Sequence, residues 1–179
     1  MSWRNSCPDS PIASKRSALS LSERIELFQE VLERGLDARV PVTGRSMTPF
    51  LRDGDVVTLR AVPFSSLRWG DIIFFRSADD RPVMHRIVRW RRRGGRTLVQ
   101  TAGDAVGGLD PPVGEEGILA KVCSVERRRN ALGGRKINME SSRWRAIGGF
   151  LSFVSLARAG FRVIAKKLGI RRRAAPDGA

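Results

Sequence analysis

One serine and the only histidine of the chain stand in settings that suit nucleophilic catalysis. Ser46 lies in the segment V-T-G-R-S-M-T-P-F-L-R-D-G-D-V-V (residues 42–57), two residues after Gly44 and three before Pro49. The glycine permits a close backbone approach and the proline stiffens the turn, so the segment presents one hydroxyl on a rigid loop. A serine needs a base to take its proton, and His85 is the only imidazole available. This pair predicts acyl-transfer chemistry.

Two aspartates follow on a glycine-rich segment, T-A-G-D-A-V-G-G-L-D, and are candidates for a third catalytic role. A carboxylate there, Asp104 or Asp110, would hold the imidazole of His85 in the correct tautomer and stabilise its protonated form. Three other aspartates also stand beside glycines, where aspartate commonly caps a turn, and we assign that structural role to Asp53, Asp55 and Asp71.

Four ordered blocks of sequence resemble the catalytic domain of type I signal peptidases, whose superfamily also contains the LexA-like self-cleaving repressors. The blocks are G-R-S-M-T-P-F-L-R-D-G-D-V-V, W-G-D-I-I-F-F-R, M-H-R-I-V and T-A-G-D-A-V-G-G-L-D, within roughly residues 40–125. One such block arises easily by chance, whereas four in this order and spacing form a strong signal. The histidine of the third block, where bacterial enzymes have a lysine, resembles the archaeal and endoplasmic-reticulum type.

The resemblance implies a serine endopeptidase that hydrolyses a peptide bond of a precursor protein. By the match, Ser46 is the nucleophile, His85 is the general base and Asp110 orients His85. Asp104 becomes a supporting carboxylate of the same glycine-rich block. The alternative is a catalytically silent module of the same fold that binds a peptide or a membrane.

The resemblance also implies where the oxyanion and the substrate lie. In the family the amide of the nucleophile donates to the oxyanion, and some signal peptidases add a hydroxyl two residues before the serine. Here that position is Gly44, so a second donor must be a backbone N–H or the guanidinium of Arg45. Met47 and Pro49 would shape a groove in which an extended peptide pairs with a strand.

The elements that must position these residues read as a mainly β domain with a helix at each end. Residues 20–35 have helical spacing of apolar side chains, a capping box of Ser20 and Glu23, and Gly35 at the end. Short β-rich runs with glycine, proline and aspartate between them predict strands over 38–43, 55–62, 71–76, 83–91, 97–101, 117–127 and 135–139. We expect a coiled, barrel-like sheet, which the resemblance also implies.

These patterns divide the chain of 179 residues into one domain with appendages. The expected parts are a disordered tail (1–17), an N-terminal helix (18–36), the catalytic β domain (37–142), a basic amphipathic helical segment (143–170) and a second tail (171–179). The chain is long enough for one well-buried domain.

The C-terminal segment is apolar on one side and basic on the other. Residues 143–179 carry nine basic and one acidic side chain, and the whole chain has a net charge of +15. Its longest apolar stretch, residues 146–157, is too short to cross a bilayer. Two readings remain open: the segment docks on the domain, with a break at Gly160, or residues 143–173 lie on an anionic membrane surface.

The remaining composition narrows the partners. One histidine and two cysteines, Cys7 and Cys123, offer no metal-ligand cluster, and no phosphate-binding loop occurs, so we expect no cofactor. Nucleic acid is not the expected partner, because no helix-turn-helix precedes the sheet and the basic clusters 89–96 and 127–129 read as solvated turns and strand ends. We expect a cytoplasmic protein, with peripheral attachment to the inner face of the membrane as the alternative.

Overall fold

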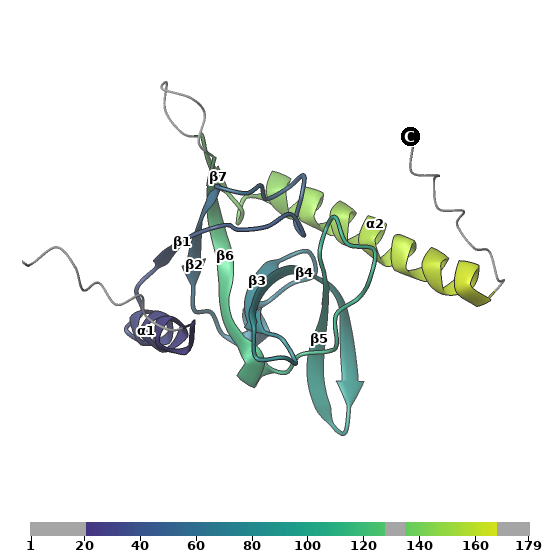
Figure 1. The fold of residues 1–179 in the computed structure, drawn as a ribbon, viewed down its shortest axis with the longest axis horizontal. Helices are drawn as coiled ribbons and strands as arrows, with labels where there is room; N and C mark the ends of the chain where they lie inside the picture. The colour runs from purple at the N-terminus through teal and green to yellow at the C-terminus, as the bar shows by residue number, and fades with distance from the viewer. Residues whose placement is uncertain (1–20, 128–134, 168–179) are drawn as a thin grey trace, which may run out of the picture.

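One antiparallel sheet of seven strands forms the centre of the molecule (Figure 1). The computed structural model describes residues 21–127 and 135–167; the expected tails (1–17 and 171–179) lie outside this part. The strands run in the order β1-β2-β6-β3-β4-β5, and β7 pairs with β6. Their bounds are β1 Ala38–Pro41, β2 Val56–Arg60, β3 Ile72–Arg76, β4 Pro82–Arg93, β5 Arg96–Ala102, β6 Ile118–Arg127 and β7 Arg135–Asn138.

The sheet is curled but open, so the barrel-like closure expected from the sequence is wrong. Register shifts in the β2–β6, β3–β6 and β4–β5 pairings bend the sheet, as bulges do. Its end strands, β1 and β5, pair only with β2 and β4 among the described strands. A groove lies between β1 and the first half of β4. With two helices packed beside this sheet, the fold is mixed α/β rather than the mainly β domain that the sequence predicted.

The sheet is buried on both faces, and β3 shows how its sequence achieves this. Ile72 and Phe74 belong to one apolar cluster, whereas Ile73 and Phe75 belong to another. Alternate residues of a strand point to opposite faces, so a run of four apolar residues fills both clusters. Each predicted strand is present, with ends that differ by a few residues. Two 3-10 turns, Phe64–Ser66 and Glu115–Gly117, lie in the connections.

Helix α1, Leu21–Glu33, packs its apolar side over the edge of the sheet near β1. Ile25 and Leu32 are buried, and the ring of Phe28 meets that of Phe74 edge to face at 5.2 Å. This is the ordinary arrangement of an amphipathic helix, with apolar residues turned towards the core.

The end of α1 follows the sequence prediction. Gly35 has φ 71°, and the N–H of Leu36 donates to the carbonyl of Val31 at 3.3 Å, as in a helix ended by a left-handed glycine. Ser20, the proposed capping partner of Glu23, lies outside the described residues.

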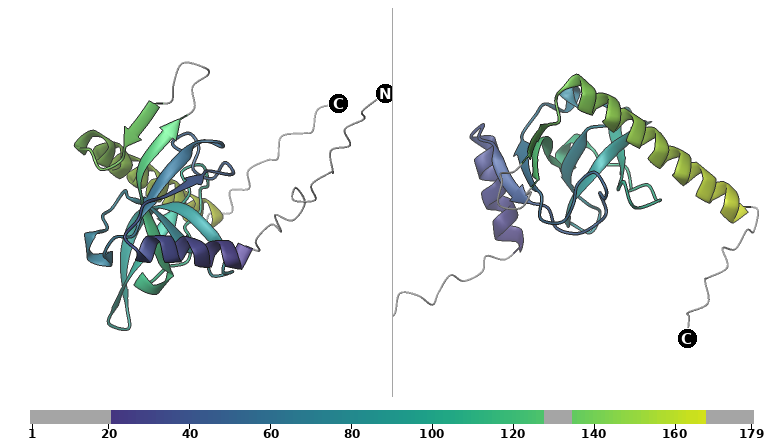
Figure 2. Two further views of the ribbon diagram at one scale, coloured as in Figure 1. Left: turned by 90° about the vertical axis from the view of Figure 1, so that its left-hand side faces the viewer. Right: turned by 90° about the horizontal axis from the view of Figure 1, so that it is seen from above.

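Helix α2, Ser142–Lys167, runs along β4 and continues through Gly160 without the expected break. Figure 2 shows α1 and α2 on opposite sides of the sheet, with the end of α2 projecting beyond it. Among the described residues, neither helix combines the length and the hydropathy needed to cross a bilayer.

Candidate active site

Ser46 lies on the connection between β1 and β2, which is fixed at both ends by backbone hydrogen bonds. The N–H of Val42 donates to the carbonyl of Asp55 at 2.8 Å, and that of Gly54 donates to Val42 at 3.0 Å. The carboxylate of Asp53 accepts the N–H of Gly44 at 3.0 Å, so this aspartate organises the turn as predicted. The nucleophile candidate therefore stands on a braced loop.

His85 on β4 and Asp110, beyond β5, form a hydrogen-bonded pair. Nδ1 of His85 lies 2.7 Å from Oδ2 of Asp110, and the hydroxyl of Thr101 donates to the same oxygen at 2.6 Å. The N–H of Asp110 donates to the carbonyl of Thr101 at 2.9 Å, which fixes the carboxylate against the strand. With Nδ1 facing a carboxylate, the imidazole carries its proton on Nδ1 and keeps Nε2 free to accept another.

Ser46 and His85 meet at Gly103, a residue whose importance the sequence did not reveal. A Cβ added to Gly103 would lie 3.0 Å from Nε2 of His85, 3.3 Å from Cβ of Ser46 and 2.8 Å from its carbonyl oxygen. Only a residue without a side chain leaves room for this approach. Among the described residues no hydrogen bond joins Ser46 Oγ to Nε2; such contacts are often long without substrate and tighten on binding.

Asp104 pairs with Arg86 and does not contact the imidazole. Nε and Nη2 of Arg86 donate to its two carboxylate oxygens at 2.9 and 2.7 Å, and both side chains are buried. The carbonyl of Asp104 accepts from Arg158 of α2 at 3.4 Å, and the next residue, Ala105, donates its N–H to Ser46 at 2.8 Å. Asp104 thus supports the loop around Ser46, the kind of indirect role that the resemblance implies. The sequence did not single out Arg86.

The candidate oxyanion donors differ in whether they already donate a hydrogen bond within the protein. The N–H of Gly44 is taken by Asp53, which leaves it unable to serve without a rearrangement. Within residues 21–127 and 135–167, the N–H of Ser46 donates to no acceptor. Arg45 is exposed beside it. The serine amide is therefore an available backbone donor at the nucleophile, and the guanidinium of the adjacent Arg45 is the side-chain candidate.

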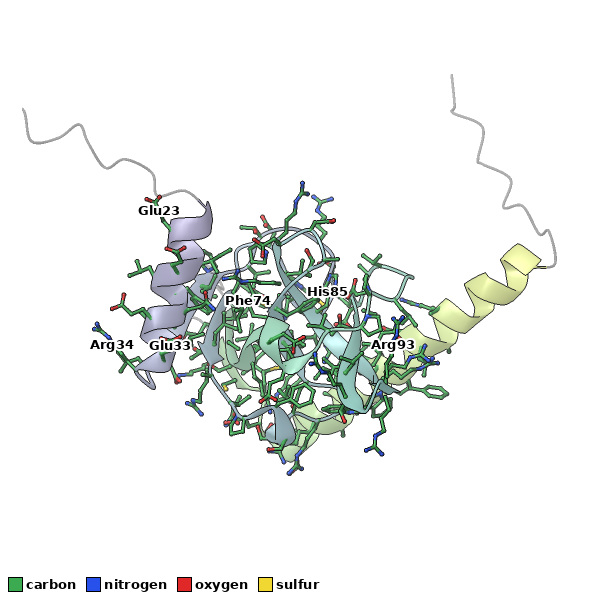
Figure 3. The ribbon with its side chains drawn as sticks, turned by 90° about the horizontal axis from the view of Figure 1, so that it is seen from below. Glu23, Glu33, Arg34, Phe74, His85 and Arg93 are labelled. Carbon is green, nitrogen blue, oxygen red and sulfur yellow. The ribbon has the colours of Figure 1, made fainter. Side chains whose placement is uncertain are left out.

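A groove of about 810 Å³ holds both Ser46 and His85. Met47, 3 % exposed, forms part of its apolar wall, whereas Pro49 lies exposed in the same turn and outside the lining. Figure 3 shows Phe74 between α1 and His85, in agreement with the contact of Phe74 and α1. The lining comes from α1, β1, the serine loop and the β3–β4 hairpin, namely Ile25, Phe28, 39–44, Ser46, Met47, Leu51, Phe74 and 82–85.

The side chains of Lys121 and Cys123 could also react, but their surroundings keep both in a protonated or paired state. The ammonium of Lys121 lies 3.0 Å from the carboxylate of Asp71, and both side chains are largely buried. Burial raises the pKa of the Cys123 thiol, which keeps it in the unreactive protonated form. In the part of the chain that the structure describes, no group of three histidine, cysteine, aspartate or glutamate residues could hold a metal ion.

Comparison of the chain with models of protein families, with curated proteins and with solved structures gives no match. The resemblance to signal peptidases therefore rests on the four sequence blocks.

Proposed function

We propose that the chain is a serine endopeptidase of signal-peptidase type that cuts an extended segment of a precursor protein. The observation that carries this proposal is the convergence of Ser46 Cβ and His85 Nε2 at Gly103, with Asp110 on the far side of the imidazole. The candidate nucleophile and base thereby line one groove, and the group that would orient the base is bonded to the imidazole beside it.

The chemistry follows from these positions. Ser46 Oγ attacks the scissile carbonyl carbon while Nε2 of His85 takes its proton, and Asp110 stabilises the resulting imidazolium through Nδ1. The oxyanion is stabilised by the N–H of Ser46, and collapse of the intermediate expels the amine, which takes the proton back from His85. Water then attacks the acyl-enzyme with His85 again as base, releasing the acid and free Ser46.

The edges of the sheet support a peptide substrate in extended form. Residues 82–85 of β4 pair with β3 alone, because the pairing with β5 begins at Arg86. Strand β1 pairs only with β2 among the described strands. Both strands line the groove, so two edges with unused backbone groups flank the space where a substrate strand would add.

The alternative, a silent binding module, draws support from the oxyanion site. Gly44 contributes no hydroxyl and its amide is engaged by Asp53, so transition-state stabilisation would rest on few donors. Loss of one donor typically costs about 3 kcal/mol of barrier height. A module of this kind would bind the peptide and leave it intact.

Turnover of a peptide library separates these possibilities. Wild type should cleave a subset of peptides, and Ser46→Ala should remove this cleavage while keeping the fold. Ser66→Ala is the matched control, because Ser66 is exposed and its hydroxyl bonds only the nearby carbonyl of Pro63. Equal cleavage by wild type and Ser46→Ala would exclude the proposed nucleophile, and binding without cleavage by wild type would favour the silent module.

The pH dependence distinguishes His85 from a lysine base. A protonated Nε2 cannot accept the serine proton, so activity should decline towards acid pH. A rate that rises only in the alkaline range would implicate Lys121, although its ammonium is paired with Asp71. Initial rates across the pH range, with circular dichroism to follow folding, provide the measurement.

A further inference from the structure

Helix α2 packs on the sheet with its small and polar residues. The hydroxyl of Ser152 donates to the carbonyl of Ile87 at 2.9 Å and is fully buried. A Cβ on Gly148 would lie only 2.8 Å from the carbonyl oxygen of Gly70, so helix and loop are in close contact there. Ser155 is buried on the same side. Close approach of these small residues seats the middle of the helix, and near its start Trp144 packs edge to face on the ring of Phe50 at 5.6 Å.

The opposite side of α2 exposes three large apolar residues to solvent. Phe150 is 66 % exposed, Phe153 61 % and Ile147 39 %. Trp69 is 44 % exposed, and its ring lies 3.2 Å from the position that a Cβ on Gly149 would occupy, so it widens the apolar strip. We call these four side chains the outer apolar strip. An ordinary surface helix turns its large apolar side chains towards the core, so exposed apolar surface of this kind marks an interaction site.

The charge of the same helix indicates what covers the strip. Helix α2 has no acidic residue, and its charged residues are Arg143, Arg145, Arg158, Arg162, Lys166 and Lys167. A second copy of the chain would bring two such cationic helices together, at a cost in repulsion. An anionic surface offers complementary charge instead.

We infer that α2 lies in the interface of an anionic lipid bilayer, with the outer apolar strip among the acyl chains and the exposed Arg143 and Arg145 near the headgroups. The helix cannot span the bilayer, which fits a position in the plane of the interface. Trp69 keeps its indole N–H bonded to the carbonyl of Val88 at 2.9 Å, so its exposed ring can enter the interface without leaving a polar group unpaired.

Two hydrogen bonds connect α2 to the loop that carries Ser46. Arg158 of α2 bonds the carbonyl of Asp104, and the adjacent Ala105 bonds Ser46. The membrane inference does not depend on peptidase activity, because the strip and the charges are independent of Ser46 and His85. Each proposal can therefore fail without the other.

Vesicle co-sedimentation of the full chain tests the inference. Wild type should bind vesicles made of equal parts phosphatidylcholine and phosphatidylglycerol, and should bind phosphatidylcholine alone far less. Raising sodium chloride from about 0.05 M to about 0.5 M should weaken binding, because salt screens the attraction. No binding to the anionic vesicles, or equal binding to both kinds, would overturn the inference. So would a stable dimer that hides the strip, seen by sedimentation equilibrium.

A double variant tests the contribution of the exposed apolar side chains to membrane binding. Phe150→Ser with Phe153→Ser should lower the partition coefficient by about tenfold or more, since two large apolar side chains leave the bilayer. Leu27→Ser with Leu36→Ser is the control, because these residues are 52 % and 57 % exposed elsewhere. Control and test variants that lose binding equally would contradict the assignment to α2.

Two further measurements test the role of the basic residues and the depth of Trp69 in the bilayer. Arg143→Gln with Arg145→Gln should reduce binding to anionic vesicles by about tenfold or more, given the contribution of each basic residue near such a surface. Brominated lipids should quench wild-type tryptophan fluorescence more than that of Trp69→Phe, which needs no change to α2. Equal quenching of the two proteins would overturn the placement of the strip in the bilayer.

Discussion

His85 and Arg86 are neighbours on β4, and each uses a carboxylate of the same glycine-rich segment. Alternate residues of a strand point to opposite faces, so His85 reaches Asp110 beside the groove and Arg86 reaches Asp104 in the interior. The side chains of the first pair are 12 % and 26 % exposed, and those of the second 0 % and 2 %. The accessible pair suits proton transfer to a substrate, whereas the sealed pair can only support its surroundings.

The sealed pair is better bonded than the accessible one. Arg86 makes two bonds to Asp104, a third to the carbonyl of Gly70 at 2.8 Å, and stacks over the ring of Phe50 at 4.6 Å. Each N–H of Arg86 that has an acceptor lowers the free-energy cost of burying its guanidinium. Changes in the two pairs should therefore appear in different quantities: the reaction rate for the first and the free energy of unfolding for the second.

The largest effect should come from Asp110→Asn. An amide accepts poorly from Nδ1–H and favours the wrong tautomer of His85, so kcat should fall by about 10⁴-fold. Steady-state kinetics on a cleaved peptide provide the measurement, with Asp79→Asn in the exposed β3–β4 turn as the control. A decrease of less than tenfold would mean that Asp110 does not orient the base.

Arg86→Met should act on stability. It leaves the carboxylate of Asp104 buried without its partner, which typically costs about 3–5 kcal/mol of unfolding free energy. Urea denaturation measures this cost, and Arg92→Met, exposed on the same strand, should stay within about 0.5 kcal/mol of wild type. Adding Asp104→Leu should recover about 1–2 kcal/mol, because the orphaned charge is removed. Additive losses would contradict this account of the pair.

The smallest effect should come from Asp37, a surface carboxylate that pairs with Arg60. Hydrogen bonds from Arg60 at 2.7 and 2.8 Å hold the pKa of Asp37 below its usual value. A lowered folded-state pKa stabilises the fold above the unfolded-state pKa, and this contribution disappears as the pH falls through the folded-state value. Asp37→Asn should therefore cost at most about 1 kcal/mol at neutral pH and nothing in strong acid. Urea titrations at the two pH values would detect a larger cost.

The strands and the members of the candidate site were accessible to sequence reasoning because both depend on local order. Glycine, proline and aspartate punctuate the β-rich runs, and each predicted strand appears with shifts of a few residues. Ser46, His85 and Asp110 were chosen by residue type and block order; the fold brings Ser46 and His85 to one groove and bonds Asp110 to the imidazole. Their catalytic roles remain predictions.

What the sequence did not reveal depends on packing between distant segments. Arg86 reads as one of many arginines until β4 is placed against the loop of Asp104. Gly103 is important because Ser46 and His85 approach each other beside it, and its position next to Asp104 was the only sign of this in the sequence. Helical spacing predicted an apolar side for residues 143–170, but not that the face of Gly148 and Ser152 would lie against the sheet and leave Phe150 and Phe153 exposed. Strand patterns likewise do not show whether the first and last strands of the sheet pair and close it.

The central claim is that His85 takes the proton of Ser46, and one rate comparison tests it most directly. The value of kcat/KM for a cleaved peptide should be measured for wild type and His85→Ala under conditions where both are folded by circular dichroism. We expect a fall of about 10⁴-fold or more, because loss of the base leaves the serine hydroxyl unactivated. Cleavage by His85→Ala at the wild-type rate would contradict the claim.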